Sequence, residues 1–305
     1  MSDEEHKDGR NVRRVVSWLD QKSHGDKPFF IACGIQKPHV PFWAPKKYFD
    51  LYPKEKLVIP PALVGDWNDI PPRAMVKRFK AFGFELDKEN DPLRRAYTQA
   101  YHACISFIDA QIGLLLDALK RNKLWENTIV ILISDHGYHL GEHYMWGKVS
   151  LFEECARVPM IVRVPGRTRE GTSSSGLIEL VDLCPTLLEA AGLEIPERVQ
   201  GKSFYRVLTG EAGNASHRDS VYSEYYNAWT HERSYGTMLR TENEKIVVYH
   251  GDEVGELYDL EEDPDEFTNL WDDPGHKEKK LELLKRAFDR SVLTMDPTPP
   301  RLGAF

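Results

Sequence analysis

A chain of 305 residues is long enough for one large α/β core, or for a large domain with a small one beside it. The formal net charge of −8 argues against a nucleic-acid partner, because binding to phosphates requires clustered Lys and Arg. No apolar run approaches the length of a membrane span, and the polar N-terminus carries no signal peptide, so the sequence leaves the compartment open. The four cysteines form no C-x-x-C pair, which leaves zinc and redox motifs unsupported.

The first part of the chain alternates helical and strand-like segments. Residues 11–21 have the apolar spacing of an amphipathic helix, and residues 27–35 are typical of a short, fully buried strand. The prolines between residues 38 and 61 predict an irregular excursion over the surface. A long amphipathic helix is expected over residues 92–120.

The clearest strand, residues 128–133, runs directly into Ser134-Asp135-His136-Gly137. Another strand is predicted at residues 158–164, and a helix at about 181–191 ends at Gly192. Buried strands that alternate with helices predict an α/β fold with a mainly parallel sheet flanked by helices.

The character of the chain changes after about Ser216. Short strands are predicted at residues 235–240, 245–249 and 256–260, followed by a closing helix at about 277–290. We therefore expect an α/β part over residues 1–216 and a small C-terminal α+β subdomain over residues 217–305. Asn214-Ala215-Ser216 is a glycosylation sequon, which matters only on a eukaryotic secretory route.

The residues after the strand at 128–133 have the chemistry of a metal site. In an open α/β sheet, ligands bind beyond the carboxyl ends of the strands, where Asp135 and His136 lie. A carboxylate oxygen with an imidazole nitrogen suits a divalent metal, and the simple alternative is a capping Asp beside a surface His. The glycines that follow let the backbone approach a ligand, and Lys148 supplies a compact positive charge for an oxyanion, although alone it would be an ordinary solvated lysine.

Several motifs, in family order, resemble those of the sulfatases of the alkaline phosphatase superfamily, and most of all the iduronate-2-sulfatase branch. Residues 134–143, S-D-H-G-Y-H-L-G-E-H, followed by Trp146-Gly147-Lys148, resemble the second metal-site signature of the family. K-P-F-F at 27–30 and K-P-H-V-P-F at 37–42 are similar to a block of that branch. Further landmarks are D-L-C-P-T-L-L at 182–188, E-L-Y-D-L at 256–260, and Asp263-Pro264 with Glu266.

The resemblance implies a role for each matching position. Asp135 and His136 would be calcium ligands, and Lys148 would contact the sulfate oxygens and stabilise charge in the transition state. His39 would face the sulfate as a hydrogen-bond donor or as the proton donor to the leaving alcohol; without the resemblance it is a loop histidine held by flanking prolines. The substrate would be a sulfated saccharide or another sulfate ester, and members of the family are usually exported or lysosomal.

The sequence departs from the family where the nucleophile is expected. Sulfatases have a C-x-P-x-R motif, whose Cys or Ser is oxidised by a formylglycine-generating enzyme, and an N-terminal aspartate pair on the metal; neither is found here. Cys184-Pro185-Thr186 lacks the arginine, so Cys184 is expected to be a core residue. Asp135 and His136 alone would leave calcium underligated, because it takes about six to eight oxygens. We therefore expect this chain to be inactive without an N-terminal segment and to expose strand edges and apolar surface.

Two other functions stay open. A phosphatase or phosphodiesterase of the same superfamily would share the sheet and the Asp–His metal pair, although the K-P-H-x-P-F block disfavours it. A non-catalytic sugar-sulfate binding protein would keep His39 and Lys148 without a nucleophile. Turnover of a sulfate ester, compared with binding of a sulfated saccharide, would separate these functions. Tyr138 and Trp146 are candidates either for contact with a sugar or for packing.

Overall fold

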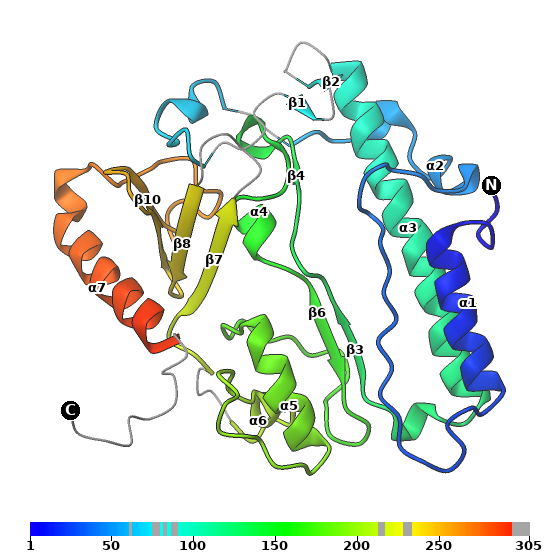
Figure 1. Ribbon diagram of the computed structural model, residues 1–305. Helices are drawn as coiled ribbons and strands as arrows, with labels where there is room; N and C mark the ends of the chain where they lie inside the picture. Colours follow the sequence, from blue (N-terminus) through cyan, green and yellow to red (C-terminus); the bar gives the residue numbers. More distant parts are fainter. Residues whose placement is uncertain are drawn as a thin grey trace, which may run out of the picture.

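The computed structural model describes residues 1–60, 63–74, 80–81, 84–86, 91–212, 217–227 and 234–294 (Figure 1). Its helices are α1 (Lys7–Asp20), α2 (Lys46–Phe49), α3 (Asp91–Arg121), α4 (Glu153–Ala156), α5 (Leu183–Ala190), α6 (Tyr205–Leu208) and α7 (Lys277–Thr294). Its strands are β1 (Lys80–Ala81), β2 (Phe84–Glu85), β3 (Val130–Ile133), β4 (His139–Leu140), β5 (Trp146–Gly147), β6 (Met160–Arg163), β7 (Val221–Asn227), β8 (Ser234–Arg240), β9 (Glu244–Tyr249) and β10 (Gly255–Asp259). Helices combined with sheets agree with the predicted α/β class.

Helices α1 and α3 pack side by side along one edge of the molecule (Figure 1). Leu19 of α1 contacts Ala118 of α3, because apolar residues recur on one face of each helix. The short helix α2 covers another part of α3, where the rings of Tyr48 and Phe107 lie 5.6 Å apart. The helices predicted at 11–21 and 92–120 are therefore confirmed.

By length and composition α3 could cross a membrane, so the expectation that no apolar run reaches that length is wrong. A core helix passes the same test. Here Ala103, Phe107 and Ala118 are buried, and the buried Gln111 accepts a hydrogen bond of 2.9 Å from Arg13 of α1. These contacts bury one face of α3, and 33% of its apolar stretch is buried in this structure.

The central strands differ from the prediction in direction. β3 and β6 pair antiparallel, with Val130 opposite Arg163 and Ile133 opposite Met160, and every other strand pair that the structure describes is also antiparallel. The expectation of a mainly parallel sheet is thus wrong for the described strands. A short apolar run is found in both parallel and antiparallel sheets. Its sequence therefore does not predict the relative direction of the strand with which it pairs.

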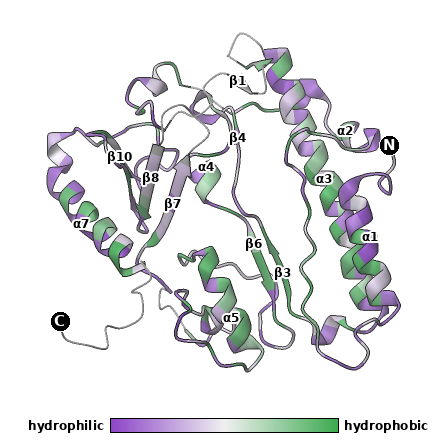
Figure 2. Ribbon diagram, in the orientation of Figure 1, coloured by the Kyte–Doolittle hydropathy of each residue, from purple (hydrophilic) through white to green (hydrophobic). Residues whose placement is uncertain are grey.

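The prediction of a strand at residues 27–35 is also wrong. These residues form no strand, and the ring of Phe30 is 82% exposed. On the neighbouring pair of strands, Ile133 is 44% and Ile161 is 64% exposed, and Figure 2 shows both strands as hydrophobic. Apolar surface is therefore exposed here, as the sequence predicts, and it lies on the strands that lead to the candidate site.

The C-terminal part is an antiparallel sheet in the order β10-β9-β8-β7, with α7 packed on one face (Figure 1). Leu283 and Ala287 of α7 contact Leu239, Ile246 and Leu257 of the sheet. The predicted strands at 235–240, 245–249 and 256–260 and the closing helix are confirmed, whereas β7 was not predicted. Polar residues between the tyrosines of Val221–Asn227 obscure its alternation.

The other face of this sheet shares a hydrophobic core with the rest of the chain. Met238 and Val247 of the sheet pack in one cluster with Met145, Leu151 and Phe152. The division into residues 1–216 and 217–305 therefore stays a prediction. Residues 213–216, and with them the sequon at Asn214, lie outside the described residues.

Helix α5 corrects the expectation for Cys184. The thiol is exposed, whereas the adjacent Pro185 and Thr186 are buried. The helix is fixed from its N-terminal side by the buried Asp182, whose carboxylate accepts a hydrogen bond of 2.7 Å from the backbone amide of Lys202. Because this anchor and the helical period place residues 185 and 186 on the inner side, Cys184 faces outward.

Candidate metal and sulfate site

The turn after β3 is shaped by local hydrogen bonds. The backbone amide of His136 donates to Asp135 Oδ1 at 3.0 Å, and Ser134 Oγ donates to the carbonyl of His136 at 2.8 Å. The amide of Gly137 then donates to the carbonyl of Cys155 at 2.9 Å. These bonds tie the end of β3 to helix α4 and hold two adjacent side chains at the strand end.

Asp135 and His136 lie side by side, with Asp135 Oδ2 3.6 Å from His136 Nε2. His136 Nδ1 lies 2.8 Å from the carbonyl of Gly137, which can only accept, so Nδ1 donates and, in the neutral ring, Nε2 is the nitrogen that can accept or bind a metal. The carboxylate of Asp135 is 87% exposed. Two donor atoms at this separation can both reach one calcium ion, whose ligands lie at about 2.3–2.6 Å, so the pair fits the metal that the family implies.

Lys148 lies next to this pair, with its Nζ 3.0 Å from His136 Nε2. The approach results from a tight hairpin in which β4 and β5 pair antiparallel, with His139 opposite Gly147. The hairpin returns the chain to the turn after β3, twelve residues from His136. Three of the four predicted site residues, Asp135, His136 and Lys148, are thus brought together.

His39 lies in a loop that a buried lysine stabilises. Lys37 is 7% exposed, and its Nζ donates to the carbonyl oxygens of His39 and Pro41, both at 2.6 Å. Burial lowers the pKa of Lys37. The His39 ring is exposed, with Nδ1 2.7 Å from the carbonyl of Val40, and no hydrogen bond between the described residues joins it to the other three.

Aromatic side chains join the His39 loop to the turn after β3. The ring of Phe42 lies 5.9 Å from that of Tyr138 and 4.9 Å from that of Tyr97, a residue of α3. The hydroxyls of Tyr97 and Tyr138 are 2.7 Å apart, and burial raises the pKa of Tyr138. The ring of Trp146, which is 1% exposed, packs on Tyr97. Trp146 is therefore a packing residue.

Sequence reasoning did not identify Lys37 and Tyr97 as supports of the site. In the sequence, Lys37 is only one residue of the K-P-H-V-P-F block, and Tyr97 is one aromatic residue in a long predicted helix, so neither has a signal of its own. Among the described residues, no group of three or more His, Cys, Asp and Glu side chains could hold a metal ion. A calcium ion at Asp135 and His136 therefore needs further ligands.

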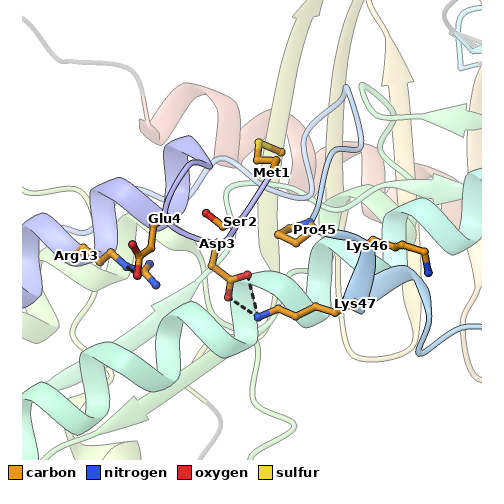
Figure 3. A pocket seen from close by; sticks show the side chains of 8 residues that line it. All are labelled: Met1, Ser2, Asp3, Glu4, Arg13, Pro45, Lys46 and Lys47. Carbon is orange, nitrogen blue, oxygen red and sulfur yellow. Dashed lines mark hydrogen bonds and ion pairs between the residues drawn. The ribbon is translucent and has the colours of Figure 1, made fainter.

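A surface depression of about 640 Å³ lies elsewhere, at the N-terminus of the described chain (Figure 3). Asp3 and Lys47 form an ion pair of 3.0 Å at its wall. None of the four candidate site residues lines it.

Substitution of Gly137 by alanine is expected to displace the turn that carries Asp135 and His136. A Cβ at this position would lie 1.9 Å from the carbonyl oxygen of Glu154, so the backbone has to move. We expect the free energy of unfolding to fall by about 1–3 kcal/mol, the usual cost of overpacking, measured by urea denaturation. The control is Gly113→Ala, where the added Cβ has free space; an equal effect of both substitutions would contradict the prediction.

Comparison with known proteins gives the family. The model of the sulfatase family matches residues 1–193, and the model described as N-sulphoglucosamine sulphohydrolase, C-terminal, matches residues 141–291. A sulfatase from Formosa agariphila is 32% identical over 286 residues, which cover 93% of this chain and 54% of the relative. Human iduronate 2-sulfatase is 34% identical over 243 residues, which cover 68% of this chain and 44% of the relative.

Among solved structures, a phosphonate monoester hydrolase from Silicibacter pomeroyi aligns with a TM-score of 0.87 and 24% identity, covering 98% of this chain and 62% of that chain. At this identity the likeness shows the fold alone. The chain spans about half the length of the two sulfatases. The family model covers more than half of the chain, and its match includes all four candidate residues. The chain therefore belongs to the sulfatase family.

Proposed function

We propose that this protein hydrolyses sulfate esters, and that its substrates are sulfated sugars of the iduronate type. The observation that carries the proposal is the convergence of Lys148 on the Asp135–His136 pair, with Nζ 3.0 Å from His136 Nε2. An ammonium beside a carboxylate–imidazole metal pair suits an anionic ester such as a sulfate ester, because it stabilises the negative charge on the oxygens in the transition state. The similarity to human iduronate 2-sulfatase supports the sugar class.

In this proposal each residue has a separate task. Asp135 and His136 would hold a calcium ion, which supplies positive charge to the sulfate oxygens when it is bound. Lys148 donates to the same nitrogen that the metal would take, so occupation of that nitrogen leaves its ammonium available to an anion. His39, exposed on a loop fixed by Lys37, would donate a hydrogen bond to the sulfate or a proton to the leaving alcohol.

The expected need for an N-terminal nucleophile segment can be tested directly. We expect residues 1–305 alone to give negligible turnover of an aryl sulfate, because none of the four cysteines lies in a C-x-P-x-R motif. The full-length protein, meaning this chain joined to an N-terminal segment that carries the C-x-P-x-R motif, is expected to turn the same ester over when it is co-expressed with a formylglycine-generating enzyme. Clear metal-dependent turnover by residues 1–305 would refute the expectation.

The same assay distinguishes the other functions. A phosphonate monoester and a phosphate monoester are tested beside the sulfate ester, because the phosphonate monoester hydrolase shares the fold. Preference for either phosphorus ester would replace the proposal with the phosphatase alternative. Binding of a sulfated saccharide by the full-length protein without turnover of any ester would favour a binding protein.

A further inference from the structure

The hairpin that carries Lys148 contains strained backbone beside the lysine. Val149, the next residue, has φ of 76°, in the left-handed region that a β-branched side chain rarely adopts. His143 and Tyr144, earlier in the same hairpin, have φ of 51° and 56°. Such conformations persist only where the surroundings enforce them, and they occur most often at functional sites.

One buried residue, His139, contacts the chain on both sides of Lys148. Its backbone lies opposite Gly147 in the β4–β5 pair, which fixes the residue before the lysine. Its Nε2 lies 2.8 Å from Ser150 Oγ, which fixes the second residue after the lysine. His139 is 1% and Ser150 is 8% exposed, so water competes little for this hydrogen bond. The strained Val149, whose side chain is exposed, therefore lies between two residues that His139 contacts.

On its other side the His139 ring lies beside a buried polar cluster, although its Nδ1 makes no hydrogen bond there. Glu154 Oε2 lies 3.9 Å from both His139 Nδ1 and His143 Nε2, and His143 Nδ1 lies 3.3 Å from Asp66 Oδ2. The ring of Phe152 stacks on His143 at 4.2 Å. Glu154 belongs to α4, His143 to the hairpin and Asp66 to the turn at Asp66–Asn68, so residues of three segments meet in this cluster.

The His139 ring is expected to keep one protonation state, so its contacts do not change with pH near neutrality. Burial, and the neighbouring His143 and Lys245, lower the pKa of His139 to about 3. The imidazole therefore stays neutral above that pH, and its hydrogen bond to Ser150 is kept.

We propose that His139 is a positioning residue: by holding Gly147 and Ser150 on the two sides of Lys148, it keeps Val149 in its strained conformation and fixes the Lys148 ammonium against His136. The kinetic consequence rests on the proposed function, because it requires that Lys148 acts on a substrate. The structural consequence, a hairpin held closed at residues 147–150, does not depend on it.

The kinetic test is a double-mutant cycle in the full-length protein with an aryl sulfate. Ser150→Ala removes one partner of the hydrogen bond with a small change in volume, and we expect kcat to fall by about 10-fold to 100-fold with little change in KM. His139→Gln, which keeps a polar group near the Nε2 position, should restore most of kcat relative to His139→Leu. In a Lys148→Ala background, Ser150→Ala should lower kcat by less than about twofold, since residues that act through one another are not additive.

The matched control is His217→Gln. His217 likewise has little exposed side chain, 7%, and its Nε2 lies 3.1 Å from Oδ2 of Asp182, the residue that precedes α5. We expect it to leave kcat unchanged. An unchanged kcat for Ser150→Ala, or full additivity with Lys148→Ala, would overturn the positioning role.

Hydrogen exchange gives a second measurement that needs no activity. The protection factors of the amides at residues 147–150 should fall by at least about tenfold in Ser150→Ala and His139→Leu, and stay unchanged in His217→Gln. Unchanged protection in Ser150→Ala would overturn the proposal even if the enzyme is active. If the full-length wild-type protein turns over no sulfate ester, the proposed function fails, and this exchange experiment still decides whether His139 holds the hairpin.

Discussion

Replacement of Lys148 by alanine in the full-length protein is expected to lower kcat on a sulfate ester by about two to three orders of magnitude, the typical loss for one donor that stabilises charge in the transition state. The sulfuryl oxygens and the leaving oxygen carry the negative charge in that state, and the ammonium lies 3.0 Å from the Asp135–His136 pair. Steady-state kinetics at saturating substrate measure the effect. Thermal stability should change little, because the Lys148 side chain is only partly buried.

Lys148→Arg should restore only part of kcat, since a planar guanidinium does not reproduce a compact point charge. The control is Lys285→Ala, which removes a lysine 70% exposed on α7 and should leave kcat unchanged. A kcat close to that of the wild type for Lys148→Ala would show that this lysine is an ordinary surface charge.

Replacement of Lys245 by methionine is expected to lower the free energy of unfolding by about 3–5 kcal/mol, the usual cost of removing one partner of a buried ion pair. Lys245 on β9 is fully buried, and its Nζ lies 2.7 Å from Glu266 Oε1 and 3.4 Å from Glu153 Oε1. Methionine fills a similar volume, so the main loss is the charge that compensates these carboxylates. Urea denaturation at pH 7 measures the effect.

Urea denaturation is measured at pH 7 because Lys245 is fully charged there. Burial lowers the pKa of the ammonium, but the charges of Glu266 and Glu153 outweigh burial and raise it above the ordinary 10.5. The stabilisation from a raised pKa is fully present below the unfolded value and is lost as the pH rises through the folded value. The pair therefore contributes fully at pH 7.

A surface ion pair supplies the control for Lys245→Met. Lys46 of α2 pairs with Asp50, the residue that follows the helix, and their side chains are 84% and 57% exposed. Lys46→Met should change the free energy of unfolding by less than about 1 kcal/mol, because water screens the pair. A loss below about 1 kcal/mol for Lys245→Met would mean that the buried carboxylates are neutral when the lysine is absent.

The sequence alone determined the local features of this protein. The helices at 11–21 and 92–120, the C-terminal strands and the closing helix follow from apolar spacing, which acts within a few residues and can be read directly. Asp135 and His136 could be placed together for the same reason, because they are neighbours at the end of one apolar strand. The family followed from whole motifs in order, such as K-P-H-V-P-F and the run at 134–143.

The tertiary structure decided everything that depends on a distant partner. The antiparallel pairing of β3 with β6 was not predictable, since an apolar run does not specify the strand it will join. The exposed position of Cys184 depends on how Asp182 fixes the start of α5. The approach of Lys148 to His136, with His139 buried beneath it, requires a hairpin whose strained residues are stable only in the packed protein.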